Sequence, residues 1–207
     1  MKKAVYSLVF AMVLVFLAPP SFASTVTVTF DDVPGAAIGL PIPNGYRELT
    51  WYNMSIVDNS DWQPSGYKNG IVSGNWVAYN ACAGDANVSL DGNTFDFVGG
   101  YFTAAWRNGL TIDVTGYLAG EKKYFQSITV DASGPTLFVF DYLDVDLVWF
   151  SSYGGTYAGF DYDQPHFAVD NMIFQSDSFT MPVPLPGALW LMGSGFAALM
   201  ALRKRRG

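Results

Sequence analysis

The stretch Leu110-Thr111-Ile112-Asp113-Val114-Thr115 alternates apolar with polar side chains. A period of two residues is typical of a β-strand that buries one of its faces. The same alternation runs through Ser24 to Phe30, where Thr alternates with Val, and Thr136 to Phe140 is rich in aromatic and β-branched residues. Because no helical period persists between these stretches, the pattern predicts a region built from strands.

Gly-containing dipeptides separate the expected strands. Asn108-Gly109 lies between Phe102 to Arg107 and Leu110 to Val114. This dipeptide favours the positive φ angles of a type I′ hairpin turn, so we expect these two strands to be antiparallel neighbours. Ala119-Gly120 predicts a similar turn before Lys123 to Val130, and Asp91-Gly92 separates Val88 to Leu90 from Thr94 to Val98.

We therefore predict an all-β fold, an antiparallel jelly-roll β-sandwich of about ten short strands. The sequence has no convincing internal repeat, which argues against a β-helix or a propeller. The remaining expected strands are Leu49 to Val57, Trp76 to Asn80, Asp146 to Ser151 and Phe167 to Phe174.

The composition excludes several classes of function. The 207 residues include one Cys and one His, which rules out an intramolecular disulfide and both multi-cysteine and His-rich metal sites. The formal net charge is -7 and no basic cluster lies in the middle of the chain, which argues against nucleic acid as a partner. We expect Cys82 to be buried among Val77, Ala78 and Ala81, and His166 to be an ordinary strand-end residue.

The N-terminal segment has the pattern of a secretory signal peptide. Lys2 and Lys3 precede a charge-free run from Ala4 to Ala18, and Ser21-Phe22-Ala23 supplies small residues at the spacing that a signal peptidase recognises. We expect residues 1–23 to be removed by cleavage after Ala23. The alternative is an uncleaved membrane anchor.

The C-terminal segment has a Pro motif, an apolar run and a basic end. Val183-Pro184-Leu185-Pro186 leads into the charge-free run 187–202, and Arg203, Lys204, Arg205 and Arg206 follow. The apolar run is of marginal length for a transmembrane helix, and the cations favour a cytoplasmic end. We therefore divide the chain into three parts. Residues 1–23 are the expected signal peptide, residues 24–180 the expected β-sandwich domain, and residues 181–207 a C-terminal segment that is expected to enter the membrane.

This tail resembles the PEP-CTERM sorting signal of Gram-negative bacteria. Leu185 stands where the name-giving signal has Glu, which is similar to a known variant of the signal. The alternative is an ordinary C-terminal tail anchor. The matching residues are Val183, Pro184, Leu185, Pro186, Ala188, Trp190, Leu191, Gly193, Ser194 and Gly195.

The resemblance implies a route and two partners for export. After signal peptidase, an exosortase in the membrane recognises such tails and cuts near the Pro motif. The precursor is then expected to span the inner membrane by its C-terminal helix for a time. The mature domain is expected in the periplasm, on the cell surface or outside the cell, in species that produce exopolysaccharide.

The region between the two signals is strongly acidic. Six of the 11 cations lie in the terminal segments, so five cations remain against 18 acidic residues, a net charge of -13. Its length suits one domain with a sizeable core. This acidity is consistent with a domain that works outside the cell.

Two polar, Gly-rich stretches, Asp58 to Asn69 and Ser151 to Pro165, are expected to be long surface loops. Aromatic side chains on loops can stack on the apolar faces of ligands such as sugars. The alternative is that they fold back onto the sheets and anchor the loops. The candidate ligand-binding residues are Trp62, Tyr67, Tyr153, Tyr157, Phe160 and Tyr162, whereas we expect Trp51, Trp76, Trp106 and Trp149 to lie mostly in the core.

Carboxylates at the ends of the chain suggest a calcium site. Asp31 and Asp32 end the first expected strand, and Asp170 and Asn171 lie in the last. First and last strands are neighbours in many secreted sandwiches, and Ca²⁺ takes six to eight oxygen ligands. The arrangement is similar to the structural Ca²⁺ site of carbohydrate-binding jelly rolls. The alternative is that Asp32 starts a turn and Asp170 is hydrogen-bonded to the backbone.

The middle of the chain resembles an uncharacterised β-sandwich family that is common among exosortase substrates and has no established activity to transfer. We expect a noncatalytic sandwich that binds polysaccharide or another matrix component. The motifs that carry the resemblance are Phe30-Asp31-Asp32, Pro43-Asn44-Gly45-Tyr46 with Leu49-Thr50-Trp51, Tyr67-Lys68-Asn69-Gly70-Ile71-Val72-Ser73-Gly74, Ala78-Tyr79-Asn80 and Phe167-Ala168-Val169-Asp170-Asn171.

Two other functions stay open. A glycan-active enzyme needs only two suitably spaced carboxylates. Glu48 and Glu121 are the only glutamates, however, and His166 has no evident Ser or Cys partner. A structural or ice-surface role is suggested by the row Thr25, Thr27 and Thr29, although an ice lattice would need several such rows.

Overall fold

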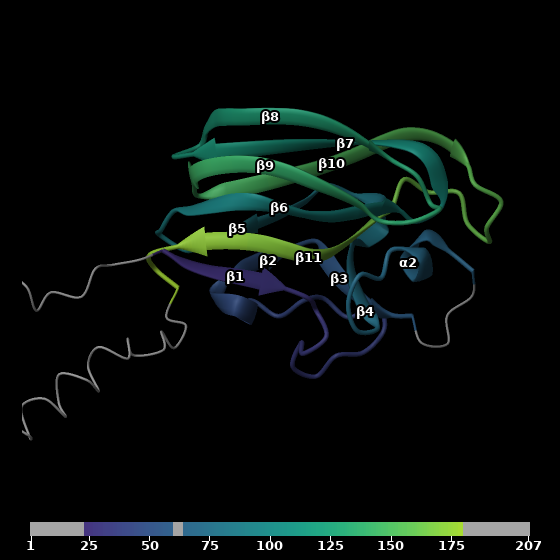
Figure 1. Ribbon diagram of the computed structural model, residues 1–207, viewed down its shortest axis with the longest axis horizontal. Helices are drawn as coiled ribbons and strands as arrows, with labels where there is room; N and C mark the ends of the chain where they lie inside the picture. Colours follow the sequence, from purple (N-terminus) through teal and green to yellow (C-terminus); the bar gives the residue numbers. More distant parts are fainter. Residues whose placement is uncertain (1–22, 60–63, 180–207) are drawn as a thin grey trace, which may run out of the picture.

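The chain forms two antiparallel β-sheets packed face to face, so the predicted all-β sandwich is confirmed. The structure, a computed structural model shown in Figure 1, describes residues 23–59 and 64–179. The predicted signal peptide, the Pro motif, the apolar run 187–202 and the basic end lie outside these residues, apart from Ala23 itself.

The larger sheet, called sheet A, has the order β3-β4-β11-β6-β9, and β1 pairs with β11 beside β4. The first and the last strand are therefore neighbours, as predicted. The strands of sheet A are β1 (Ser24–Val28), β3 (Met54–Asp58), β4 (Trp76–Asn80), β6 (Phe95–Ala104), β9 (Thr136–Val145) and β11 (Phe167–Ser176).

The second sheet, called sheet B, has the order β2-β5-β10-β7-β8. Short helical turns lie in the connections between the strands. The strands of sheet B are β2 (Thr50–Tyr52), β5 (Ala86–Ser89), β7 (Arg107–Leu118), β8 (Glu121–Val130) and β10 (Leu147–Tyr157), and the helical turns are η1 (Tyr46–Glu48), α2 (Gly66–Asn69) and η2 (Ala81–Ala83).

The main core lies between the inner faces of the two sheets. Every second residue of a strand points inward, so β10 buries Val148 and Phe150 while Trp149 between them is only half-buried. Phe97 of β6 meets Phe150 of β10 edge to face, with ring centroids 6.0 Å apart. Aromatic pairs of this kind join the two sheets.

Two predictions about turns have different outcomes. Ala119 and Gly120, with φ angles of 52° and 80°, connect β7 and β8, which pair as the expected hairpin. The hairpin predicted at Asn108-Gly109 is wrong, because both residues lie inside β7 and Asn108 is the register partner of Thr156 in β10. The chain crosses between the sheets at the buried residues Ala105 and Trp106, so β6 and β7 belong to different sheets.

Strand boundaries differ from the predictions in two places. The expected strand Leu49 to Val57 is divided at Asn53, whose φ angle is 52°, so β2 belongs to sheet B and β3 to sheet A. The loop expected from Ser151 begins only after Tyr157, because β10 continues to that residue and pairs with β7. Tyr153 and Tyr157 are therefore strand residues.

The prediction that Cys82 is buried is wrong. Its thiol is exposed, because Cys82 lies in η2 with a φ angle of 53° and does not continue the alternation of β4.

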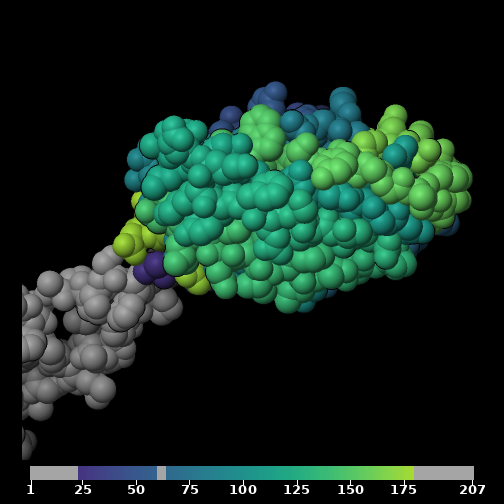
Figure 2. Space-filling view, turned by 90° about the horizontal axis from the view of Figure 1, so that it is seen from above, coloured from purple at the N-terminus to yellow at the C-terminus, as the bar shows by residue number. Residues whose placement is uncertain are grey.

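Both ends of the described domain lie at the same end of the sandwich. Ser24 at the start of β1 is the register partner of Ser176 at the end of β11. Figure 2 shows the first purple residues beside the last yellow-green ones at this end. Among residues 23–59 and 64–179, no helix is long and apolar enough to cross a membrane.

Candidate functional site

The helical turn α2 is held tightly against the outer face of sheet A. The Ser65 hydroxyl caps it by accepting a hydrogen bond of 3.3 Å from Lys68 N, and Gly66 N donates to Ala105 O at 2.8 Å. A Cβ at Gly66 would lie 1.7 Å from Ala104 O, so only glycine permits this approach. The contact fixes Tyr67, the next residue, over the sheet.

A second apolar cluster lies beneath α2, on the outer face of sheet A. Phe167 and Val169 of β11 point into the main core, whereas Ala168 between them belongs to the second cluster. A sandwich needs only the core between its sheets. The second cluster therefore indicates that the connections over this outer face pack against the sheet. The members of the cluster are Val57, Tyr67, Val77, Ala105, Trp106 and Ala168.

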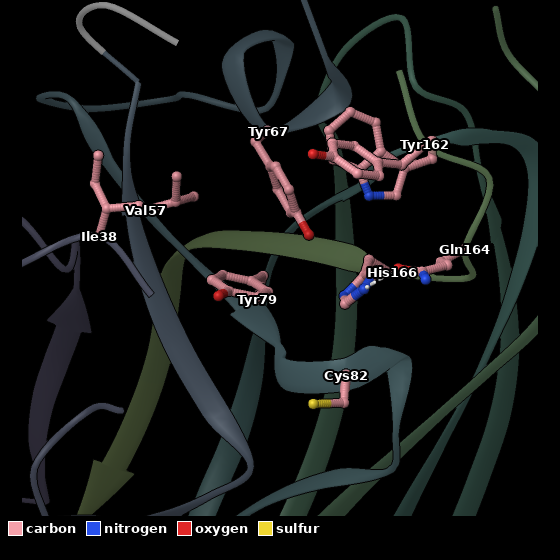
Figure 3. Close-up of a pocket in the computed structure, with 9 residues that line it drawn as sticks. Ile38, Val57, Tyr67, Tyr79, Cys82, Tyr162, Gln164 and His166 are labelled. Atoms are coloured by element: carbon pink, nitrogen blue, oxygen red, sulfur yellow. Dashed lines mark hydrogen bonds between the residues drawn. The ribbon is translucent and has the colours of Figure 1, made fainter. Parts of the chain in front are cut away.

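A pocket of about 270 Å³ opens beside this cluster. Figure 3 shows Tyr67 descending into it from α2, with Tyr79 below and His166 beside the Tyr67 hydroxyl. The pocket is of a size for one or two sugar rings or another small ligand. Its lining residues are Ile38, Val57, Tyr67, Tyr79, Cys82, Trp106, Tyr162, Gln164 and His166.

The aromatic walls of the pocket support one another. The centroid of the Tyr67 ring lies 5.1 Å from that of Trp106 and 5.2 Å from that of Tyr79, and the Tyr162 centroid also lies 5.1 Å from that of Trp106. Tyr67 and Trp106 are buried, but Tyr162 is 56% exposed. Tyr162 is therefore the ring of this wall that a ligand in solution meets first.

Polar groups lie at one side of the pocket. Nδ1 of His166 lies 2.7 Å from the carbonyl oxygen of Asn80, so Nδ1 carries the proton and Nε2 accepts. Nε2 lies 3.1 Å from Oε1 of Gln164, and because an amide oxygen only accepts, Gln164 donates to the neutral ring when its amide group is turned to present the nitrogen. Burial lowers the pKa of His166 and raises the pKa of both Tyr67 and Tyr79. The pocket is thus lined with neutral hydrogen-bonding groups at neutral pH.

The predicted contact residues fall into two groups. Tyr67 and Tyr162 meet at the pocket, and Phe160 packs against both apolar clusters, as the loop-anchor alternative expected. Tyr153 and Tyr157 lie on β10 and are 50% and 56% exposed. Trp62 lies outside the described residues.

Several pocket residues did not follow from the predicted contact set. Trp106 was expected in the core, and it is buried, but one side of it also lines the pocket. Trp51 is buried as expected, whereas Trp76 and Trp149 are half-buried. Tyr79 lies in a motif of the resembled β-sandwich family but was not predicted as a contact residue, and Gln164 gave no sequence signal that separates it from other loop residues.

Asp170 clamps the connection that precedes β4. One of its oxygens accepts from Val72 N at 2.8 Å and Ser73 N at 3.0 Å, and the other accepts from Asn171 N at 2.7 Å. Burial raises the pKa of Asp170 to about 6, although these backbone donors oppose the shift. This is the backbone-bonded alternative that the sequence left open.

Asp31, three residues after the end of β1, clamps the same connection. It accepts from Asn75 N at 2.9 Å and Trp76 N at 3.2 Å, and the hydroxyl of Ser73 donates to Asn171 Oδ1 at 2.7 Å. A Cβ at Gly74 would lie 1.8 Å from the Asp31 carboxylate, so glycine is required beneath it.

Asp32 does not join these groups. It accepts hydrogen bonds from Tyr46 and Arg47, at 2.8 Å and 2.5 Å, and forms an ion pair with Arg47. Over residues 23–59 and 64–179, no three His, Cys, Asp or Glu side chains gather in a way that could hold a metal ion. Backbone N–H donors face the oxygens of Asp31 and Asp170 where a cation would have to bind, so these contacts do not fit a Ca²⁺ site. Calcium binding stays a prediction from the sequence alone, and from these contacts we expect no effect of Ca²⁺ on stability.

Comparison with known families concerns the tail. Residues 182–206 match the PEP-CTERM protein-sorting motif. The chain carries a PEP-CTERM sorting signal. The resemblance proposed from Val183-Pro184-Leu185-Pro186 and the basic end is therefore confirmed. PEP-CTERM signals indicate export and a cell-surface or extracellular destination.

No curated protein matches the chain. Among solved structures, it is similar to a variant of CBM29-2, a family 29 carbohydrate binding module, at 16% identity and a TM-score of 0.39, over 79% of this chain and 100% of that one. Another family 29 module has 15% identity and a TM-score of 0.39, and the match covers 80% of this chain and 99% of that module. The CBM51-2 and INT domains of Clostridium perfringens ZmpB have 12% identity and a TM-score of 0.35, and the match covers 73% of this chain and 32% of that one. Similarity of this degree says nothing of ligand or site.

Proposed function

We propose that this PEP-CTERM protein is a noncatalytic, exported polysaccharide-binding protein. The observation that carries the proposal is the pocket, whose lining combines the neighbouring rings of Tyr162 and Trp106 with neutral hydrogen-bonding groups. A sugar ring has an apolar C–H face and a rim of hydroxyl groups. An aromatic wall with His166 and Gln164 beside it matches both parts.

The chemistry of the pocket supports binding over hydrolysis. Among the described residues that line it, none is Asp or Glu, whereas glycosidases place two carboxyl groups on either side of the scissile bond. His166 is engaged with Asn80 through Nδ1, and its low pKa keeps it uncharged at neutral pH. These groups can orient a glycan but are not arranged to cleave one.

The position of the pocket suits a protein that is sorted by its C-terminal tail. In Figure 1, α2 lies at the opposite end of the sandwich from the start of β1 and the end of β11. A domain held near a surface through the segment after β11 would present the pocket away from that surface. We expect an exosortase to process the tail and the glycan to be a component of the surrounding matrix.

The test is affinity gel electrophoresis of the purified chain in gels that contain soluble polysaccharides from the producing strain. Tyr162→Ala should weaken retardation by about fivefold to tenfold, because it removes the exposed ring of the pocket. Tyr162→Phe keeps the ring and serves as the matched control. Retardation that is unchanged in Tyr162→Ala would reject the pocket as the binding site, and release of reducing sugars would reject the noncatalytic assignment.

A further inference from the structure

The outer face of sheet B carries a row of aromatic residues that crosses its strands. Tyr52 is the register partner of Asn87, Asn87 of Trp149, Trp149 of Thr115, and Thr115 of Phe125. The row thus runs through all five strands, β2, β5, β10, β7 and β8, with an aromatic residue on every second strand. Neighbouring strands are about 4.8 Å apart, so successive aromatic positions are about 10 Å apart.

The aromatic residues of this row point away from the core. Their neighbours in sequence, Trp51 and Val148, are buried, and side chains alternate between the faces of a strand. Tyr52 is 60% exposed and Phe125 is 54% exposed, while Trp149 is half-buried. The rings on alternate strands are separated by the shorter side chains of Asn87 and Thr115.

A row of polar residues lies directly beside the aromatic row. Ser151, Asp113 and Ser127 are register partners across β10, β7 and β8. Each lies two residues along its strand from the aromatic row, a distance of about 7 Å. The Ser127 hydroxyl donates to Asp113, and the Tyr153 hydroxyl lies 3.4 Å from the same carboxylate.

The two rows together match one class of ligand. A linear polysaccharide that crosses the strands can stack its sugar rings on the aromatic row while its hydroxyl groups reach the polar row. The spacing of about 10 Å is about the length of a disaccharide unit in an extended chain. One aromatic ring would then meet every second sugar.

The charge of the domain and the twist of the sheet further limit which polysaccharides could bind this face. The three rings are uncharged, and Lys122 Nζ is a cation beside them, 5.0 Å from the centroid of the Phe125 ring. The domain has 18 acidic residues against five basic ones, so the net charge of the domain repels an anionic polysaccharide. Sheets twist by about 20 to 25° per strand, so Tyr52 and Phe125 face directions about 80 to 100° apart. A single soluble chain can follow this twist, whereas the flat face of a crystalline polysaccharide cannot contact all three rings.

We propose that the outer face of sheet B is a second binding surface, on which Tyr52, Trp149 and Phe125 stack a single extended chain of an uncharged polysaccharide. The proposal shares the ligand class of the proposed function but none of its pocket residues. The pocket opens on the outer face of sheet A, so the two sites lie on opposite sides of the sandwich. One molecule could then bridge two chains.

The experiment is calorimetric titration of the purified chain with linear β-1,4-linked gluco- and manno-oligosaccharides, each as disaccharide and hexasaccharide. The aromatic row spans several sugars, so affinity for the sheet B site should rise from disaccharide to hexasaccharide in at least one series. Trp149→Ala should weaken hexasaccharide binding by about fivefold to tenfold, and Tyr52→Ala and Phe125→Ala should each weaken it by a smaller factor. Leu137→Ala, an exposed residue on the outer face of sheet A, is the matched control.

The outcomes separate this proposal from the pocket. Loss of hexasaccharide binding in Trp149→Ala but not in Tyr162→Ala supports the sheet B surface. Equal binding by wild type and Trp149→Ala, or no gain in affinity with length in either series, overturns it whatever happens at the pocket. A wild-type dimer that Trp149→Ala converts to a monomer also overturns it, because a second copy of the chain would then cover this face.

Discussion

The outer faces of the two sheets use the same kinds of side chain in opposite ways. On sheet A, Tyr67 and Trp106 are buried against each other beneath α2. On sheet B, Trp149 and Tyr52 stand on separate strands, where Tyr52 is 60% exposed and Trp149 is half-buried. The difference shows that strand pattern alone does not decide the role of an aromatic residue. What decides it is whether a connection folds over the strand.

The two tryptophans give the largest expected contrast. Trp106→Ala removes a buried ring that contacts Tyr67, Phe160 and Tyr162, and should lower the free energy of unfolding by about 3 to 5 kcal/mol. Trp149→Ala removes a half-buried ring from a strand surface and should cost about 1 kcal/mol. Urea unfolding of the two variants measures both values. Equal losses would mean that the two faces do not differ as described.

The Asp170 clamp on sheet A makes a prediction about pH. The pKa of Asp170 is raised by burial to about 6, above its usual value, so the folded chain holds the proton more tightly than the unfolded chain. This contribution to stability is fully present below pH 4 and is lost as the pH rises from about 4 to about 6. Its size is at most about 3 kcal/mol. Urea unfolding at a series of pH values measures it.

Asp170→Asn is the control for this pH dependence, because the amide does not titrate. The slope between pH 4 and pH 6 should disappear in the variant, and a slope that persists would assign the effect to another group.

The same variant also tests the prediction of a calcium site. With the Asp170 oxygens engaged by Val72 N, Ser73 N and Asn171 N, we expect the same Tm with CaCl₂ and with EDTA. A Tm that rises with CaCl₂ in the wild type alone would instead support a bound ion.

The smallest expected effect concerns the ion pair beside the pocket loop. Arg107 Nε donates to Asp163 at 2.8 Å, but the Asp163 side chain is 51% exposed. An exposed pair contributes less than about 1 kcal/mol, so Asp163→Asn should change the free energy of unfolding by only a few tenths. Thermal unfolding at low and high salt checks this. A loss above about 2 kcal/mol would mean that this loop supports the pocket more strongly than its exposure suggests.

The sequence predicted the layers of the fold but not every connection. Alternation in stretches such as Leu110 to Thr115 predicted the strands, because burial of one face imposes a period of two. The hairpin at Asn108-Gly109 was wrong because a turn preference is local, whereas the crossing at Ala105 and Trp106 depends on which sheet buries each strand.

The candidate sites were predictable only in part. Tyr67 and Tyr162 were predicted as contact residues from their loop context and both line the pocket, but Trp149 was expected in the core although its neighbours Val148 and Phe150 point inward. Counting the alternation through β10 would have placed Trp149 on the outer face. The alignment of Tyr52, Trp149 and Phe125 could not be read from sequence, because it depends on the register between strands.

The most direct test of the account is affinity electrophoresis of the double variant Tyr162→Ala/Trp149→Ala in a gel that contains a soluble, uncharged, linear polysaccharide bound by the wild type. The variant removes one ring from each outer face, the exposed Tyr162 and the half-buried Trp149, and leaves Trp106 in place. We predict that each single variant is retarded less than the wild type and that the double variant migrates as in a gel without polysaccharide. Wild-type retardation of the folded double variant would contradict the assignment of polysaccharide binding to these two faces.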